Sequence, residues 1–186
     1  MTMNQPLSKR TLRLAALLLG TGAATPSQAT VNESLNHPDS VYVFAYTNQH
    51  RHDAGEGLRF AYSNDMKSWQ SVVDGYSFVK SDFGAWGANK KMFVPSVARD
   101  ANGRWYAVWV VNDHSNQFAT TWSDDLYLWK PQDYPFIQKG ESIERIALTI
   151  LDGGRFQVTY KTRGGKTFRM LSDDFKTWGE PQPAAD

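Results

Sequence analysis

The stretch Ser123-Asp124-Asp125-Leu126-Tyr127-Leu128-Trp129 decides how the rest of the chain is interpreted. It has the pattern Ser-x-Asp-x-x-x-Trp, which begins again at Ser63 and at Ser172. The three serines are 60 and 49 residues apart, and self-similarity over such a period is typical of proteins built from repeated supersecondary units. In each copy we expect Ser and Asp to close a turn, and Trp69, Trp129 and Trp178 to be core anchors of their units.

Strand signals come before each copy of the motif, and no stretch has the pattern of a long helix. The expected strands are 41–47 and 58–62 in the first unit, 93–99, 105–111 and 118–122 in the second, and 146–151, 156–161 and 167–171 in the third. The tail from 181 has no strand signal.

These signals predict an all-β chain, a partial β-propeller of four-stranded antiparallel blades. The predicted domain covers residues 30–186, with about three blades at 41–75, 93–133 and 143–182. A β-sandwich is the alternative, but motif copies in register favour blades.

Residues 1–29 have the order of a secretory signal peptide. Basic residues (Lys9, Arg10, Arg13) precede an apolar run at 14–19 and a small-residue site ending at Ala29. The apolar run is too short to span a bilayer. We therefore expect cleavage after Ala29 and a periplasmic or secreted protein.

Composition excludes several classes of function. The 186-residue chain has a formal net charge of +1, which gives no reason to expect a nucleic-acid or membrane partner. Cysteine is absent, so there is no disulfide framework or thiol nucleophile. Aromatic residues make up 13% of the chain, which suits β-sheets and carbohydrate-facing surfaces.

Residues 43–47, 57–69 and 94–103 resemble the early blades of glycoside hydrolase family 43, and the likeness extends over most of residues 41–180. The resemblance implies a five-bladed propeller of the arabinanase and β-xylosidase type, acting on polysaccharides that contain arabinose or xylose. It also implies inverting hydrolysis by two carboxylates, about 6.5–9.5 Å apart, with a third that tunes the acid.

The resemblance also points to particular residues. The family commonly has Arg-Asp-Pro-Ser-Ile on an inner strand, and the matching stretch here puts Val94 at the Asp position. Valine cannot activate water. The family places a Glu just before the next inner strand, for which Glu144 is the best match and the implied catalytic residue, with Glu141 open as an alternative.

The length of the chain departs from the family as well. Five blades need about 250 residues, and three blades do not close a ring. Open edges would expose unpaired backbone and apolar blade faces. We therefore expect a fragment of a longer ancestor, an associating half or a remodelled partial propeller. A homodimer, or a partner that completes the propeller, would cover the edges.

Two groups of residues are candidates for substrate binding. Trp86, Phe83 and Tyr76 lie on the long connection 76–92, where aromatic rings could stack on sugars or pack over a blade. Asp113 and His114 follow a strand end, where side chains often line a cleft.

No metal or other cofactor is predicted. His50, His52 and Asp53 form the only metal-like spacing, but no third ligand follows at a convincing distance, so a solvated loop is favoured. The sequence has no phosphate-binding Gly-rich loop, Ser-His-Asp arrangement or dinucleotide fingerprint.

Three hypotheses remain open. The first is an inverting glycosidase of arabinoxylan or arabinan metabolism. The second is a catalytically inactive relative that binds an oligosaccharide or polysaccharide, and the third is an interaction module within an assembled propeller. Val94 and the short chain count against the first hypothesis, so whether the protein is an enzyme stays open. A family 43-like glycan protein with weak hydrolysis or none fits the sequence best.

Overall fold

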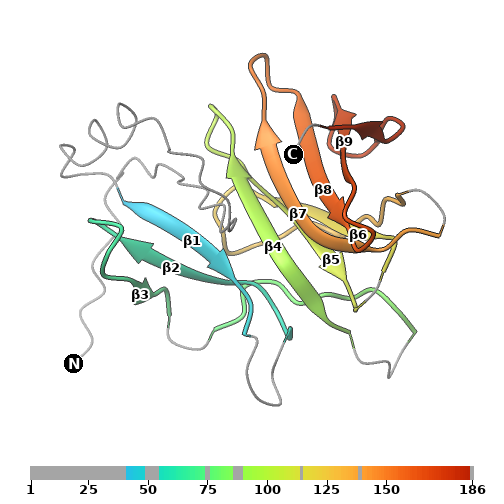
Figure 1. The fold of residues 1–186 in the computed structure, drawn as a ribbon. Coiled ribbons are helices and arrows are strands. Elements are labelled where there is room, and N and C mark those ends of the chain that lie inside the picture. The colour runs from blue at the N-terminus through green and yellow to red at the C-terminus, as the bar shows by residue number, and fades with distance from the viewer. Residues whose placement is uncertain are drawn as a thin grey trace, which may run out of the picture.

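The computed structural model describes residues 41–48, 55–73, 76–85, 90–113, 115–137 and 140–184. The expected signal peptide and several candidate residues lie outside this part of the chain, namely His50, His52, Asp53, Trp86 and His114. The described residues contain strands and turns and no helix, and they form three antiparallel sheets (Figure 1). The predicted fold, an all-β partial propeller, is confirmed.

The first sheet is a meander of β1 (Tyr42–Tyr46), β2 (Arg59–Ser63) and the short β3 (Gln70–Ser71). The line of β2 is prolonged by Leu58, which pairs with Val79. Part of the long connection therefore belongs to this sheet, because its backbone groups complete the edge of β2.

The second sheet contains β4 (Met92–Arg99), β5 (Trp105–Val111) and β6 (Phe118–Ser123). An irregular fourth segment runs along β6, where the N–H of residue 130 donates to the carbonyl of residue 122 at 2.9 Å and residues 120 and 133 exchange two bonds. The expected four-stranded unit is present, although its outer strand is not regular.

The third sheet has four strands in the order β10-β9-β8-β7. They are β7 (Ile143–Ile150), β8 (Phe156–Thr162), β9 (Thr167–Ser172) and β10 (Gln182–Pro183). The expectation that the tail carries no strand is wrong. Pro183 is tolerated because β10 lies at the edge of the sheet, where its missing N–H costs no ladder bond.

The three sheets pack face to face through two hydrophobic clusters, which is why β5 is apolar on both faces. Every residue of β5 is buried. Trp109 and its alternate neighbours face the first sheet, while Tyr106, Val108 and Val110 face the third. The inner strands β4 and β7 lie side by side (Figure 1), and the Leu148 N–H donates to Ser96 Oγ at 3.0 Å.

The Ser-x-Asp turns have the same geometry in all three units. Oδ1 of Asp65, Asp125 and Asp174 accepts the N–H groups two and three residues later at 2.7–2.8 Å, and accepts the Ser hydroxyl at 2.9–3.1 Å. These backbone hydrogen bonds favour the ionised carboxylate and lower the pKa of all three Asp, to about 2 for Asp65 and Asp174.

The residue after each Asp has a left-handed backbone, with φ of 59° at Met66, 66° at Leu126 and 63° at Phe175. Phe175 is buried in the cluster between the second and third sheets, and Leu126 packs against the other cluster. In the second and third units, the turn therefore presents this side chain, as well as the Trp, to the interior.

The prediction that all three Trp are core anchors is wrong for Trp69. Trp129 and Trp178 are partly buried and pack against the two clusters, whereas Trp69 is 37% exposed and contacts Phe44 edge to face at 5.8 Å. The first sheet faces the second with one side only, and Trp69 belongs to the other side.

At the third sheet, the expectation of an exposed apolar blade face is wrong. Alternation along β7, β8 and β9 points the apolar residues toward the second sheet. The residues on the opposite face are mostly polar: Arg145, Ala147, Thr149, Gln157, Thr159, Lys161, Thr167, Arg169 and Leu171. Such a face can stand in water without a further apolar blade against it.

Candidate functional site

The sheets have two distinct ends. The Ser-x-Asp turns and the β4–β5 and β7–β8 hairpins share one end, because ion pairs join Arg104 to Asp124 at 2.8 Å and Arg155 to Asp173 at 2.7 Å. We call this the turn end. The opposite end of the second and third sheets, formed by the described residues within 112–117, 140–143 and 162–167, we call the loop end.

Backbone hydrogen bonds hold the loop end together. The Ile143 N–H donates to the carbonyl of Ser115 at 2.9 Å, and the Arg163 N–H donates to that of Ser142 at 3.0 Å. The strand end of β5, the start of β7 and the β8–β9 hairpin therefore meet there, although they are far apart in sequence.

Two oppositely charged pairs lie at the loop end. Arg163 Nη2 donates to Asp113 Oδ1 at 2.9 Å, a pair that joins the second sheet to the third. Lys166 Nζ lies 4.0 Å from Glu141 Oε1, and the Glu141 side chain is 27% exposed. Both pairs are open to water, so we expect little stability from them. They do supply donors and acceptors at one surface.

One oxygen of Glu141 and the hydroxyl of Thr162 both lie close to Gly164. A Cβ on Gly164 would lie 3.8 Å from Glu141 Oε2 and 3.6 Å from Thr162 Oγ1. Thr162 is fully buried, and its hydroxyl has no hydrogen-bond partner among the described residues. Burial first, and the charge of Glu141 second, raise the pKa of Tyr160 to about 12, so its hydroxyl stays protonated at neutral pH.

The structure separates the two Glu candidates. Glu144 is the second residue of β7, exposed, at a register shift between Ile143 and Arg145. Glu141 comes just before the strand. Glu141 is the less exposed of the two. The sequence predicts that this strand begins at 146, which would place Glu144 before it, but β7 begins at Ile143.

The other described binding candidates, Tyr76 and Phe83, pack against other aromatic rings. Tyr76 lies in an exposed ring cluster with Phe78 and Tyr127, at centroid distances of 4.9 and 5.9 Å, and Tyr127 belongs to a turn of the turn end. Phe83 packs on Tyr134 at 4.8 Å beside a core cluster. Of the described candidates, Asp113 and Glu141 lie at the loop end, and Glu144 follows it within β7.

Val94 has an unusual backbone. Its φ is 47°, within a β-bulge between Phe93 and Ser96 near the start of β4. A β-branched residue in this region is strained. Its side chain offers no acid–base chemistry, and sequence reasoning gave no sign of the bulge.

Among the described residues, no group of three or more His, Asp or Glu side chains is arranged to hold a metal ion. The same residues include no helix of the length and apolarity needed to cross a membrane.

No protein-family model matches the sequence, and no curated protein is significantly similar to it in sequence. Solved structures are similar in fold. An exo-β-1,3-galactanase from Phanerochaete chrysosporium, with β-1,3-galactotriose, aligns with a TM-score of 0.57 and 10% identity over 76% of this chain and 35% of its own.

Two further structures agree. A family 43 β-1,3-galactosidase with galactodeoxynojirimycin has a TM-score of 0.53 and 12% identity, over 75% of this chain and 56% of its own. A putative exo-β-1,3-galactanase from Bifidobacterium bifidum has a TM-score of 0.52 and 16% identity, over 78% of this chain and 51% of its own. The chain spans about a third to about half of these structures. Its fold is that of part of a propeller of the glycoside hydrolase family 43 type.

Proposed function

We propose that the protein binds a neutral oligosaccharide at the loop end and hydrolyses it slowly or not at all. The observation that carries the proposal is the pairing of Asp113 with Arg163 across two sheets, beside Glu141 and Lys166. Sugar hydroxyls both donate and accept hydrogen bonds, so a surface with carboxylates and cations side by side suits them. The carbohydrate-acting proteins of similar fold support the same ligand class.

The sugar proposed from the sequence resemblance is arabinose or xylose, as in arabinan and arabinoxylan. The similar structures named above are described as galactanases or galactosidases. β-1,3-Linked galactose is therefore the second candidate.

Slow hydrolysis follows from the chemistry available. An inverting reaction needs an acid and a base. Glu144 is the proposed acid, with Glu141 as the alternative. Val94 stands where the resemblance implies the base, and the loss of such a group costs about 10²–10⁴ in rate. The Asp113 carboxylate forms an ion pair with Arg163, so we do not propose it as the base.

The proposal also includes export after cleavage at Ala29. It further includes association, through open sheet edges, with a second copy or with a partner. The order of residues in 1–29 supports export. Intact mass of the exported protein tests the cleavage, and light scattering of the mature protein tests the association.

The experiment for binding is a titration of the 15N-labelled protein with xylotriose, arabinotriose and β-1,3-galactotriose. We expect chemical-shift changes at Arg163 and Glu141. The double variant Glu141→Gln with Arg163→Gln should bind the sugars more weakly. Turnover of aryl-arabinoside, aryl-xyloside and aryl-galactoside by wild type, Glu141→Gln, Glu144→Gln and Val94→Asp tests hydrolysis. Fast wild-type turnover lost in Glu144→Gln or in Glu141→Gln would contradict the proposed inactivity. No shift at the loop end with any sugar would remove the binding proposal.

A further inference from the structure

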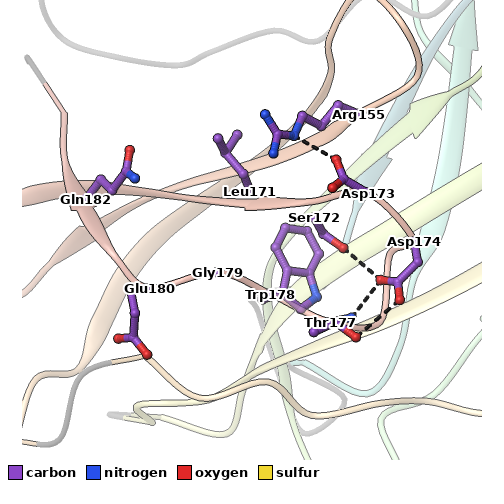
Figure 2. A pocket seen from close by; sticks show the side chains of 10 residues that line it. All are labelled: Arg155, Leu171, Ser172, Asp173, Asp174, Thr177, Trp178, Gly179, Glu180 and Gln182. Atoms are coloured by element: carbon purple, nitrogen blue, oxygen red, sulfur yellow. Dashed lines mark hydrogen bonds and ion pairs between the residues drawn. The ribbon is translucent and has the colours of Figure 1, made fainter.

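The third unit has a groove at the turn end. Its volume is about 440 Å³, within the range of about 300–1,000 Å³ for small-molecule sites. Figure 2 shows the residues that line it: Arg155, Leu171, Ser172, Asp173, Asp174, Thr177, Trp178, Gly179, Glu180 and Gln182. None of these residues belongs to the loop end.

The second unit has the same backbone frame. The N–H of Gly179 donates to the carbonyl of Leu171 at 2.9 Å, just as that of Lys130 donates to the carbonyl of Trp122 at 2.9 Å. The Arg155–Asp173 ion pair repeats the Arg104–Asp124 pair. Position 171 therefore corresponds to 122, and position 179 to 130.

In the second unit, side chains fill the corresponding space. The guanidinium of Arg104 lies 4.0 Å from the centroid of the Trp122 ring, and the ammonium of Lys130 lies 5.1 Å from it. In the first unit, the Tyr62 hydroxyl donates to the Gln70 side chain at the equivalent positions.

The third unit has Leu171 in place of the aromatic ring and Gly179 in place of the long polar side chain. The groove is thus the space that a ring and its cover occupy elsewhere in the molecule.

The walls of the groove have the chemistry that a sugar ring needs. Leu171 and Trp178 give apolar surface, and Figure 2 shows the Arg155–Asp173 pair on one side of Leu171 and Gln182 on the other. Glu180 adds an acceptor on the side of the strand where Trp178 lies. A flat aromatic ligand would leave these rim groups unused, whereas a sugar places CH groups on an apolar floor and hydroxyls at a mixed rim.

We propose that this groove is a second carbohydrate subsite, which takes one ring of a neutral oligosaccharide where the second unit holds Trp122. The sugar class rests on the proposed function. The location does not, because the groove is defined by comparison of the units. A bound ring would lie on Leu171 beside the Arg155 guanidinium, with hydroxyls toward Gln182.

The test uses the double variant Leu171→Trp with Gly179→Lys, which fills the groove with the residues of the second unit. Gly179 has no positive φ, and a Cβ there would meet only the Leu171 carbonyl at an ordinary 3.6 Å. Titrations with xylotriose, arabinotriose and β-1,3-galactotriose are followed at the Trp178 indole N–H and the Gln182 side-chain amide. We expect wild-type shifts there, and a Kd in the refilled variant at least about tenfold higher, with shifts at Arg163 unchanged.

Glu180→Ala with Gln182→Ala is a second variant, because both side chains are exposed and their loss should leave the fold intact. This double variant should likewise raise the Kd measured at the Trp178 indole N–H. Groove shifts that survive both variants would overturn the inference.

The response of wild type separates this inference from the proposed function. Shifts at Arg163 with none at Trp178 or Gln182 overturn the groove and leave the loop end. Shifts in the groove alone support the subsite and overturn the loop-end proposal, while no shift at either place overturns both.

Discussion

The turn end and the loop end of the sheets are built in different ways. At the turn end, the same carboxylate makes the same hydrogen bonds three times, at Asp65, Asp125 and Asp174. At the loop end, the Asp113–Arg163 and Glu141–Lys166 pairs join different segments, and neither belongs to the repeated motif.

This contrast distinguishes residues that serve the scaffold from residues that do not. A side chain that recurs with the same geometry in every unit satisfies a need that every unit has, such as closing a turn. A residue that occurs in one unit only is not explained by a structural requirement that all units share. Leu171 and Gly179 show the same rule inside the turn end, since they depart from a repeated frame and a groove results.

The largest effect is expected from removing a repeated residue that reaches the core. Phe175 is buried and contacts the rings of Tyr106 and Phe156, both at 4.8 Å. Phe175→Ala should lower the free energy of unfolding by about 3–5 kcal/mol. Met66→Ala is the matched control, because Met66 has the same left-handed backbone but is only partly buried. Equal losses in urea unfolding would mean that the backbone, not the packing, sets the cost.

A smaller effect is expected from acid. The pKa of Asp65 and Asp174 is about 2 in the folded protein, against 3.8 for the free side chain. A lowered folded pKa gives stability that is complete above about pH 4–5 and is lost as the pH falls through the folded pKa, because the unfolded chain binds protons first. The melting temperature should therefore fall between about pH 4 and pH 2.

The variant Asp65→Asn with Asp125→Asn and Asp174→Asn is the control for the acid prediction. It should be less stable at pH 7 and show a flatter dependence between pH 4 and pH 2. An unchanged slope would assign the acid sensitivity to other carboxylates.

The smallest effect on stability is expected at the loop end. Asp113 and Arg163 are 60% and 47% exposed, so Arg163→Gln should change the free energy of unfolding by no more than about 1 kcal/mol. The same variant should weaken oligosaccharide binding. The exchange Asp113→Arg with Arg163→Asp keeps the pair and serves as its control. Strong destabilisation by Arg163→Gln would make the pair part of the scaffold, and the contrast between the two ends would fail.

The sequence alone determined the features that depend on neighbours in the chain. A Ser-x-Asp turn closes through bonds between residues two and three apart, so three copies of the motif predicted three turns. Residues 105–111 are apolar without alternation, which predicted a strand buried on both sides, and β5 is the middle strand of the middle sheet.

Which faces are covered, and which distant residues meet, depends on how the sheets pack together. Trp69 and Trp178 have the same place in the motif, but one lies on an outward face and the other against a core cluster. Asp113 and Arg163 are 50 residues apart and meet because two sheets pack together. When the repeats are aligned, Leu171 and Gly179 differ from the residues at the same positions in the other units. They open a single groove because the Gly179 N–H is hydrogen-bonded to the Leu171 carbonyl, which places the two residues side by side. Burial and pairing of this kind depend on the whole fold, because a motif fixes its own turn but not what packs against it.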